Sequence, residues 1–507
     1  MEPDKEAAAN HVEALNGPSM VVQEKSTTSQ QRLAFIAEKE MTLLAGLKKY
    51  PWSVFWSVIV SMIIVMEGYD IVLLGGLLPQ PAFRKHYGSY SDAHGWQISG
   101  PWQAGLNNAT TCGTIFGALA NGYLTQRFGY RRTVLGALLF INATIAMQVF
   151  ATSLGMLAAA NFLCGLPWGL FSVMAPAYAS EVTPNVLRGY LANFVCFCWA
   201  AGMLISSGVQ TAFSKRQDQW AYRIPYAIQW VWPVPLMCLL WFAPESPWIL
   251  VRRKKYAEAG RMIERLSSKN EMVDKDAVVS MMKHTIETEQ ELEAGTSYWD
   301  CFKGANLRRT EISCVAFMCQ QFDGTAITGN AVYFFTQAGV GTETAYNLSV
   351  VSLALSCVGV VVSWFLIYRF GRRTLYLFEL WTSLIGLFAV ATAATISDSQ
   401  KSSYAQAGIV ICSVLIRFAT TGPIVCNTSQ TYLINPTELN LKGKSGWVWS
   451  GTCILLILWA YFRLPETKGR LFEEIDLLFA NRVPARKFRV TNVELFDSTV
   501  TKEDEKA

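Results

Sequence analysis

One short motif occurs twice in the sequence, as RFGYRRT at residues 127–133 and as RFGRRT at residues 369–374. Each copy directly follows an apolar run that is long enough to cross a bilayer, and its basic residues end that run. Each run is also the second in a series of such runs. The same turn at equivalent positions predicts an internal repeat, which is typical of transport proteins built from two homologous membrane halves.

Composition and hydropathy agree with a membrane protein. The chain has 507 residues, of which 51% are apolar and only 16% are charged, whereas soluble domains carry about 25% charge. Apolar runs of spanning length predict an all-α polytopic protein. In the first half we predict spans at residues 52–78, 101–124, 133–152, 154–178, 190–213 and 224–242, and in the second half at 312–338, 348–368, 375–396, 407–425 and 447–462.

The polar segments divide the chain into five parts. We predict an N-terminal tail at 1–50, a first membrane half at 51–243, a linker at 244–310, a second half at 311–464 and a C-terminal tail at 465–507. Residues 257–266 of the linker have the spacing of an amphipathic surface helix. Lys and Arg gather beside alternate ends of the spans, which predicts a multi-pass cell-membrane protein with both termini cytoplasmic.

Several classes of function are disfavoured by the sequence. The basic residues that give the net charge of +5 lie in short runs beside spans, which indicates topology and not nucleic-acid binding. Most of the 12 cysteines lie in apolar runs and predict buried thiols, not disulfides. We find no metal-spaced His or Cys cluster, nucleophile elbow or phosphate-binding loop, so we expect no enzyme and no cofactor.

Five motifs occur in the order found in a known family. They are GYLTQRFGYRR (122–132), PAYASEVTP (176–184), PESPW (244–248), QQFDG (320–324) and PETKG (465–469). With these motifs the chain resembles the sugar porters of the major facilitator superfamily. EGYD (67–70), GLPWG (165–169) and WAYRIP (220–225) resemble the fungal α-glucoside, or maltose-type, permeases. The resemblance implies two six-helix halves, a sugar as the solute, the proton as coupling ion and a monomer in the bilayer.

Glu67 and Asp70 are the most informative polar pair. They lie three residues apart, so they share a helix face within the first predicted span. Carboxylates in a span are costly unless they face a cavity or a partner. The resemblance implies that the pair binds the coupled proton, and the alternative is a hydrated pair at the outer end of a tilted helix.

Candidate sugar contacts come from two helices. The amides of Gln320, Gln321 and Asn330 could bind sugar hydroxyls near the midplane, or they could form interhelical hydrogen bonds. Trp168 could stack on a sugar ring, and apolar packing is an equally good interpretation.

Charged residues of the motifs predict a gate. The resemblance implies that arginines at the cytoplasmic rim pair with three glutamates in the outward-open state and release them when the protein opens inward. Exposed ion pairs are weak enough to break and reform. The residues are Arg127, Arg131, Arg188, Arg369, Arg372 and Arg373, with Glu181, Glu245 and Glu466. The alternative is that the arginines only set the topology.

Three positions depart from the family pattern. The related permeases have an acid where Thr114 stands, and sugar porters have an Arg or Glu at the position of Asn161. Met203 takes the place of a glutamine that contacts sugar in the family. These changes remove two ionisable groups and one hydrogen-bonding group from the predicted cavity.

A fourth departure lies near the C-terminus. After Cys426 the chain runs directly into residues 427–436, where the family has the end of helix 10, a loop and most of helix 11. Roughly 30 residues are missing, which is more than one span, so helices 10 and 11 are expected to be truncated. We therefore expect a proton-coupled sugar importer, with a transporter of another metabolite or a non-transporting sensor or inactive paralogue as alternatives.

Overall fold

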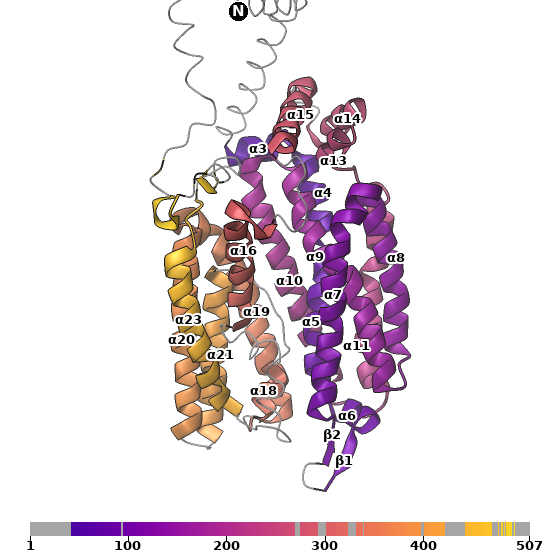
Figure 1. The fold of residues 1–507 in the computed structure, drawn as a ribbon. Helices are drawn as coiled ribbons and strands as arrows, with labels where there is room; N and C mark the ends of the chain where they lie inside the picture. The colour runs from indigo at the N-terminus through magenta and orange to yellow at the C-terminus, as the bar shows by residue number, and fades with distance from the viewer. Residues whose placement is uncertain are drawn as a thin grey trace, which may run out of the picture.

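The computed structural model describes residues 42–92, 95–268, 274–292, 301–322, 331–337, 339–396, 400–420 and 442–468, with scattered positions from 475 to 491. Its long helices run side by side along one axis (Figure 1). Short helices of the linker cover one end of this bundle, which we call the linker face. A small β-hairpin projects from the opposite end, the hairpin face.

The N-terminal half contains six spanning units. A short helix, α3 (Leu43–Lys49), precedes them, and α6 (Pro81–Tyr87) and the antiparallel strands β1 (Ser89–Ser91) and β2 (Gly95–Gln97) lie between the first two. The units are α4 (Pro51–Ser61) with α5 (Ile63–Leu77), α7 (Gly100–Phe128), α8 (Tyr130–Val149), α9 (Leu154–Val182), α10 (Asn185–Phe213), and α11 (Trp220–Ile228) with η1 (Gln229–Val231) and α12 (Pro233–Leu240).

Two of these units are interrupted for local reasons. The Ser61 hydroxyl donates to the carbonyl of Ser57 at 2.7 Å just before the break between α4 and α5, and such back-bonding bends helices. Pro225 and Pro233 lie on either side of η1 and remove two backbone donors from the sixth unit. The predicted spans at 52–78 and 224–242 are therefore each built from two helices.

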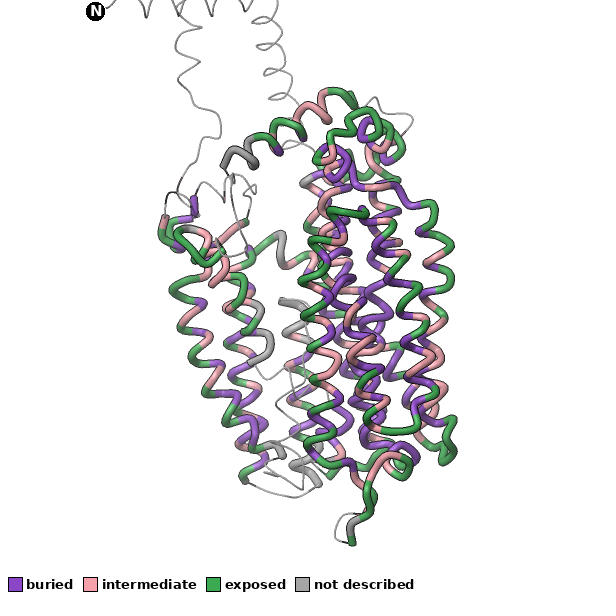
Figure 2. Tube along the Cα trace, turned by 45° about the vertical axis from the view of Figure 1, so that its right-hand side comes forward, coloured by how far each residue is buried: buried purple, intermediate pink, exposed green. Residues whose placement is uncertain are grey.

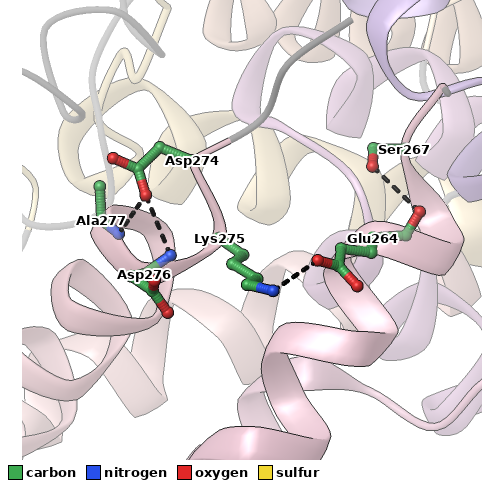
Figure 3. Close-up of polar contacts among 6 residues, drawn as sticks. All are labelled: Glu264, Ser267, Asp274, Lys275, Asp276 and Ala277. Carbon is green, nitrogen blue, oxygen red and sulfur yellow. Dashed lines mark hydrogen bonds and ion pairs between the residues drawn. The ribbon is translucent and has the colours of Figure 1, made fainter. Parts of the chain in front are cut away.

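The linker forms a small apolar cluster on the linker face. Its helices are α13 (Pro247–Arg252), α14 (Tyr256–Leu266) and α15 (Lys275–Leu292). Their buried apolar side chains include Leu250, Ile263 and Met282. α14 corresponds to the predicted surface helix and begins one residue earlier. Lys275 Nζ donates to Glu264 Oε1 at 2.7 Å and ties α15 to α14 (Figure 3).

The C-terminal half repeats much of this order. Its elements are α16 (Gly304–Phe322), α18 (Ala331–Gln337), α19 (Thr342–Phe370), α20 (Arg372–Ile396), α21 (Gln400–Thr420), η3 (Lys442–Ser445), α23 (Gly446–Arg463) and η4 (Ala485–Lys487). The two motif copies stand at matching turns, between α7 and α8 and between α19 and α20. The predicted internal repeat is thus also visible in the helix order.

Packing within the N-terminal half is closest where glycines allow it. A Cβ on Gly113 or Gly117 of α7 would lie 2.1 Å or 1.9 Å from a backbone carbonyl oxygen of α9. Small residues of this kind let membrane helices approach closely. Figure 2 shows the buried positions at the centre of this half and exposed positions on the outside. Large apolar side chains such as Ile115, Leu119 and Phe365 are exposed, as expected for helices that face lipid.

Length and composition make six helices of the described ranges long and apolar enough to cross a membrane by themselves. They are Pro51–Leu77, Tyr130–Val149, Leu154–Val182, Val186–Phe213, Thr342–Leu366 and Arg372–Thr395. With the divided and shorter units described above, they form the all-α polytopic fold that the sequence predicted.

The predicted missing segment falls between α21 and α23, at residues 426–446, most of which lie outside the described residues. α20 starts at the turn on the linker face, and α21 runs antiparallel to it. α23 ends beside the same turn, because Glu466 contacts the backbone of Arg372. α21 and α23 therefore point the same way, and 25 residues (421–445) separate the end of one from the start of the other.

Candidate functional site

A carboxylate pair lies in the buried first unit. Glu67 and Asp70 belong to α5, one helical turn apart, and Glu67 is only 7% exposed. The pair stands where three other elements meet α5: α9, α10 and the η1 turn. This position favours the interpretation of a pair that faces partners inside the protein.

Two neutral donors hold the Asp70 carboxylate. The indole Nε1 of Trp168 in α9 donates to Oδ2 at 3.1 Å, and Nε2 of Gln229 in η1 donates to Oδ1 at 3.0 Å. Both donors are buried, with Trp168 2% exposed and Gln229 fully buried. Each carboxylate oxygen therefore has its own donor. The polar edge of Trp168 is thus directed at Asp70, and the choice between sugar stacking and apolar packing for its ring stays open.

Glu67 has a different environment. Among the described residues its buried Oε2 forms no hydrogen bond of good geometry, and the indole of Trp199 on the facing helix α10 is the donor directed at this carboxyl group. Gly68 brings the two helices together here, since a Cβ at Gly68 would lie 2.4 Å from the carbonyl oxygen of Trp199. A buried carboxyl group without a full set of partners is suited to carrying a proton.

At the three positions that depart from the family pattern, each side chain is either hydrogen-bonded or packed. The Thr114 hydroxyl donates to the carbonyl of Thr110 at 3.0 Å. Asn161 accepts from Nε2 of Gln148 at 3.0 Å. Met203 is 1% exposed and packs against Val72 and Leu353. None of the three contacts recorded here is with Asp70, so the carboxylate depends on Trp168 and Gln229.

The predicted sugar amides are described only in part. Gln320 and Gln321 belong to the last turns of α16, where the structure describes the backbone and not these side chains. Asn330 lies outside the described residues. A sugar-binding role for the three remains a prediction.

The two motif turns share one geometry at the linker face. Gly129 ends α7 with φ 90° and ψ 166°, and Gly371 ends α19 with φ 87° and ψ 158°. Glu245 accepts hydrogen bonds from the backbone N–H groups of Tyr130 at 2.8 Å and Arg131 at 3.4 Å. A carboxylate at a helix N-terminus is stabilised both by these donors and by the helix dipole.

The second turn repeats this contact. Glu466 accepts from the backbone N–H groups of Arg372 at 3.1 Å and Arg373 at 3.2 Å. The sequence predicted that the gate glutamates pair with arginine side chains of the motif. In both halves the carboxylate contacts the backbone N–H groups of the residues that follow the glycine, and the pairing with arginine side chains in the outward-open state stays a prediction. The motif glycine makes the backbone contact possible, because it leaves room where a Cβ would meet the carboxylate.

The third gate glutamate, Glu181, joins α9 to the start of the linker. Its carboxylate accepts from the hydroxyl of Ser246 at 2.5 Å and from the hydroxyl of Tyr130 at 3.1 Å. Arg188 donates through Nε to the carbonyl of Thr183 at 3.2 Å. These contacts tie the end of the fourth unit to the turn between the second and the third.

The motif arginines contact groups of their own half. Nη1 of Arg127 donates to the Tyr123 hydroxyl, and the Arg131 guanidinium stands 5.7 Å from the centroid of a Trp241 ring. Arg372 donates to the Thr467 hydroxyl and Arg373 to the carbonyl of Tyr461. Arg369 is exposed. The gating role of these arginines remains a prediction.

Contacts between the halves gather toward the hairpin face. The Tyr346 hydroxyl of α19 donates to the carbonyl of Gly76 in α5 at 2.6 Å. Ser207 and Ser349 share a hydrogen bond at 3.2 Å between α10 and α19. Lys215 forms an ion pair with Glu343 at 2.7 Å at the ends of the same two helices. The described halves are thus joined by polar contacts near that end.

Sequence reasoning missed two residues of this site, Gln229 and Tyr346. Gln229 had a visible signal, because an amide within the apolar run at 224–242 needs a partner in a membrane. Tyr346 had none, because its partner is the backbone carbonyl of a residue 270 positions away. Only the packing of the two halves reveals that contact.

The chain matches the family model described as "Sugar (and other) transporter". The match has two overlapping pieces, residues 56–432 and 413–479. The overlap falls where the sequence predicted a missing segment. Among curated proteins, the chain is 34% identical to the general α-glucoside permease of Saccharomyces cerevisiae over 519 residues, which cover 96% of this chain and 84% of the relative. It is 36% identical to the maltose permease MAL31 of the same organism over 499 residues, which cover 91% and 81%.

Solved structures show the same fold. The proton:xylose symporter XylE bound to 6-bromo-6-deoxy-D-glucose superposes with a TM-score of 0.66 at 19% identity, covering 85% of this chain and 99% of that one. XylE from E. coli in a partially occluded inward open conformation gives 0.65 at 16% identity, with 83% and 100% covered. The helix order, the repeated turns and these matches lead to one conclusion: the chain belongs to the sugar transporter family of the major facilitator superfamily.

Proposed function

We propose that the protein imports an α-glucoside together with a proton by alternating access, as a monomer in the cell membrane with both termini cytoplasmic. The single observation that carries the proposal is the carboxylate pair of α5, which is enclosed by the first membrane half and held by neutral donors. Family membership supports a sugar as the solute, and the two Saccharomyces relatives are named for α-glucosides and maltose.

The coupling step follows from the partners of the two carboxyl groups. A carboxylate with no cation beside it can accept a proton without breaking an ion pair. Asp70 is held by an indole and an amide, and Glu67 keeps one oxygen free. In the proposed cycle a proton enters from the outside, neutralises one carboxylate of this pair, and allows the halves to reopen toward the cytoplasm with the sugar.

The contacts between the halves support alternating access. Three polar contacts join the halves at the hairpin face: Tyr346–Gly76, Ser207–Ser349 and Lys215–Glu343. Glu245 and Glu466 each contact the backbone within their own half at the linker face. We infer that opening toward the outside requires the first set to break.

A second candidate function is transport of a metabolite other than a sugar. Met203 favours it, because this side chain buries an apolar surface between the halves where sugar porters are expected to place an amide. A third, a non-transporting sensor or inactive paralogue, is favoured by the short connection at residues 421–445.

The test is uptake of labelled maltose by cells that lack maltose transport. We expect external acidification to drive accumulation in the wild type, and Asp70→Asn and Glu67→Gln to abolish accumulation while leaving the protein in the membrane. Asp276→Asn is the matched control, because Asp276 is an exposed carboxylate of α15 outside the bundle. Accumulation that survives Asp70→Asn would reject the coupling role, and correct insertion without uptake of any sugar would favour the other two candidates.

A further inference from the structure

The amide of Gln229 has only half of its hydrogen-bonding capacity in use. Its Nε2 donates to Asp70, while its Oε1 is buried without a partner. Gln229 is completely buried, so no water reaches this oxygen at the surface. A buried amide oxygen without a partner destabilises the fold. Gln148 of α8 has the same unpartnered Oε1, so Gln229 is distinguished from it by its partner, which is a carboxylate that can change charge.

The hydrogen bonds of the site must change when Asp70 is protonated. An ionised carboxylate accepts hydrogen bonds on both oxygens, as Asp70 does here. A protonated carboxyl must instead donate one O–H. Trp168 cannot receive it, because an indole N–H is only a donor. Of the two groups hydrogen-bonded to Asp70, only Gln229 can accept this proton, because its amide can turn by half a rotation and present Oε1 in place of Nε2.

From this juxtaposition we infer that Gln229 is a positioning residue for the coupled proton: its amide turns when Asp70 changes charge, so that the carboxyl group keeps two hydrogen bonds in both states. The inference rests on the proposed function, because it takes Asp70 as a proton-carrying group.

The groups around Asp70 favour Gln229 as the partner that keeps a hydrogen bond to Asp70 in both charge states. The other titratable side chains in its electrostatic field are Glu67 and Tyr69 of α5, Cys164 of α9 and Tyr226 of α11. Tyr69 is engaged elsewhere, since its hydroxyl donates to the carbonyl of Pro225 at 2.8 Å. No described Lys or Arg forms an ion pair with Asp70. A neutral group that can both donate and accept is therefore the partner that serves both charge states.

The local fold allows the side-chain amide of Gln229 to rotate. It lies in η1, the single 3-10 turn that separates α11 from α12. A 3-10 stretch within a longer helix often marks a hinge. Gln148, by contrast, is a buried glutamine of α8 that donates to Asn161 and does not contact Asp70. It has the same side chain and burial in the same half, and so provides a matched control.

The experiment compares two transport modes in proteoliposomes over a range of pH. Accumulation of labelled maltose against its gradient requires the proton to be released, whereas exchange of internal for external maltose at equal pH does not. We expect Gln229→Leu to keep exchange within about twofold of wild type. We expect accumulation to be lost, and the pH at which exchange is half-maximal to rise by one to two units, because the ionised carboxylate loses one of two donors. Gln148→Leu should leave the pH profile unchanged.

The possible outcomes separate the two proposals. An unchanged pH profile in Gln229→Leu, with Asp70→Asn inactive in accumulation, overturns the role of Gln229 and leaves the proton site intact. Loss of exchange in a correctly folded Gln229→Leu protein also overturns it, because the role would be structural. Accumulation by Asp70→Asn overturns both proposals. If Gln229→Leu fails to fold, Gln229→Met provides the same test, since it fills the space without a hydrogen-bonding group. Gln229→His, which can donate and accept, is expected to restore part of the accumulation.

Discussion

The two halves of the molecule carry the same glycine turn at the linker face but differ in what surrounds it. In the N-terminal half, Gly129 and Glu245 form this turn within a set of six spanning units. In the C-terminal half, Gly371 and Glu466 form it beside a connection of 25 residues between α21 and α23. The distances agree closely, since a Cβ at the glycine would lie 2.4 Å or 2.7 Å from the carboxylate.

The comparison shows which parts of a half this turn needs. It requires the two helices that flank the glycine and the last helix, which delivers the glutamate. In the C-terminal half these are α19, α20 and α23, and all three are described. The shortened connection lies between α21 and α23, so it leaves the turn unaffected.

Replacing the turn glycines should have the largest effect. Gly129→Ala and Gly371→Ala each force a side chain into a backbone region that is essentially restricted to glycine, at a cost of about 1–3 kcal/mol, and also push the new methyl group against a carboxylate. We expect a fall of several degrees in the melting temperature in detergent for both variants, with the greater fall for Gly129→Ala.

Gly136→Ala is the control, because a Cβ at Gly136 of α8 meets no atom within 4 Å. It should leave the melting temperature within a degree of wild type or raise it slightly. A normal melting temperature in Gly371→Ala, with a lowered one in Gly129→Ala, would show that the two turns are not equivalent.

A smaller effect is expected when the two glutamates lose their charge. Glu245→Gln and Glu466→Gln keep the shape of the side chain but weaken its hydrogen bonds to backbone N–H groups at a helix N-terminus. The expected loss is about 1–2 kcal/mol in each half. Thermal unfolding of the two variants and of the double variant checks this. Because the turns lie in different halves, their effects should add, and a double variant no worse than either single one would argue for a shared contact.

The smallest effects are expected from ion pairs at the linker face. Arg463 contacts Glu311 through two nitrogens, and Trp459 Nε1 donates to the same carboxylate at 3.1 Å. Glu311→Gln should cost about 1 kcal/mol after allowance for solvent screening. Its counterpart near the N-terminal half is the exposed pair of Glu264 and Lys275 (Figure 3).

That exposed pair should contribute nothing measurable. The hydrogen bond from Lys275 to Glu264 raises the pKa of Lys275 above its ordinary value. The pair is therefore intact at neutral pH and is lost in alkali, as Lys275 deprotonates. We expect equal melting temperatures for Glu264→Gln and wild type at pH 7, and a difference of several degrees would reveal a role for the linker helices in stability.

The sequence predicted more of the fold than of the site. Hydropathy located the spanning units, and the repeated RFG motif located the matching turns, because both signals depend on residues close together in the chain. The contacts that define the site join distant positions. The contact of Glu245 with backbone N–H groups was not predicted, because it depends on the positive φ of Gly129, which a residue list does not show. Gln229 could have been flagged as an amide within an apolar run, but its partner Asp70 lies 159 positions away and could not be read from the sequence.

In the proposed alternating-access cycle, the apolar contact of Val72, Met203 and Leu353 would make the equilibrium between conformations depend on temperature. These three side chains join α5 and α10 to α19 and are all less than 10% exposed. Separation of the halves at this point would bring apolar surface into contact with water, and that carries a positive change in heat capacity. The apolar attraction weakens on cooling. Cold should therefore favour the separated arrangement, and warming should favour the joined one seen here.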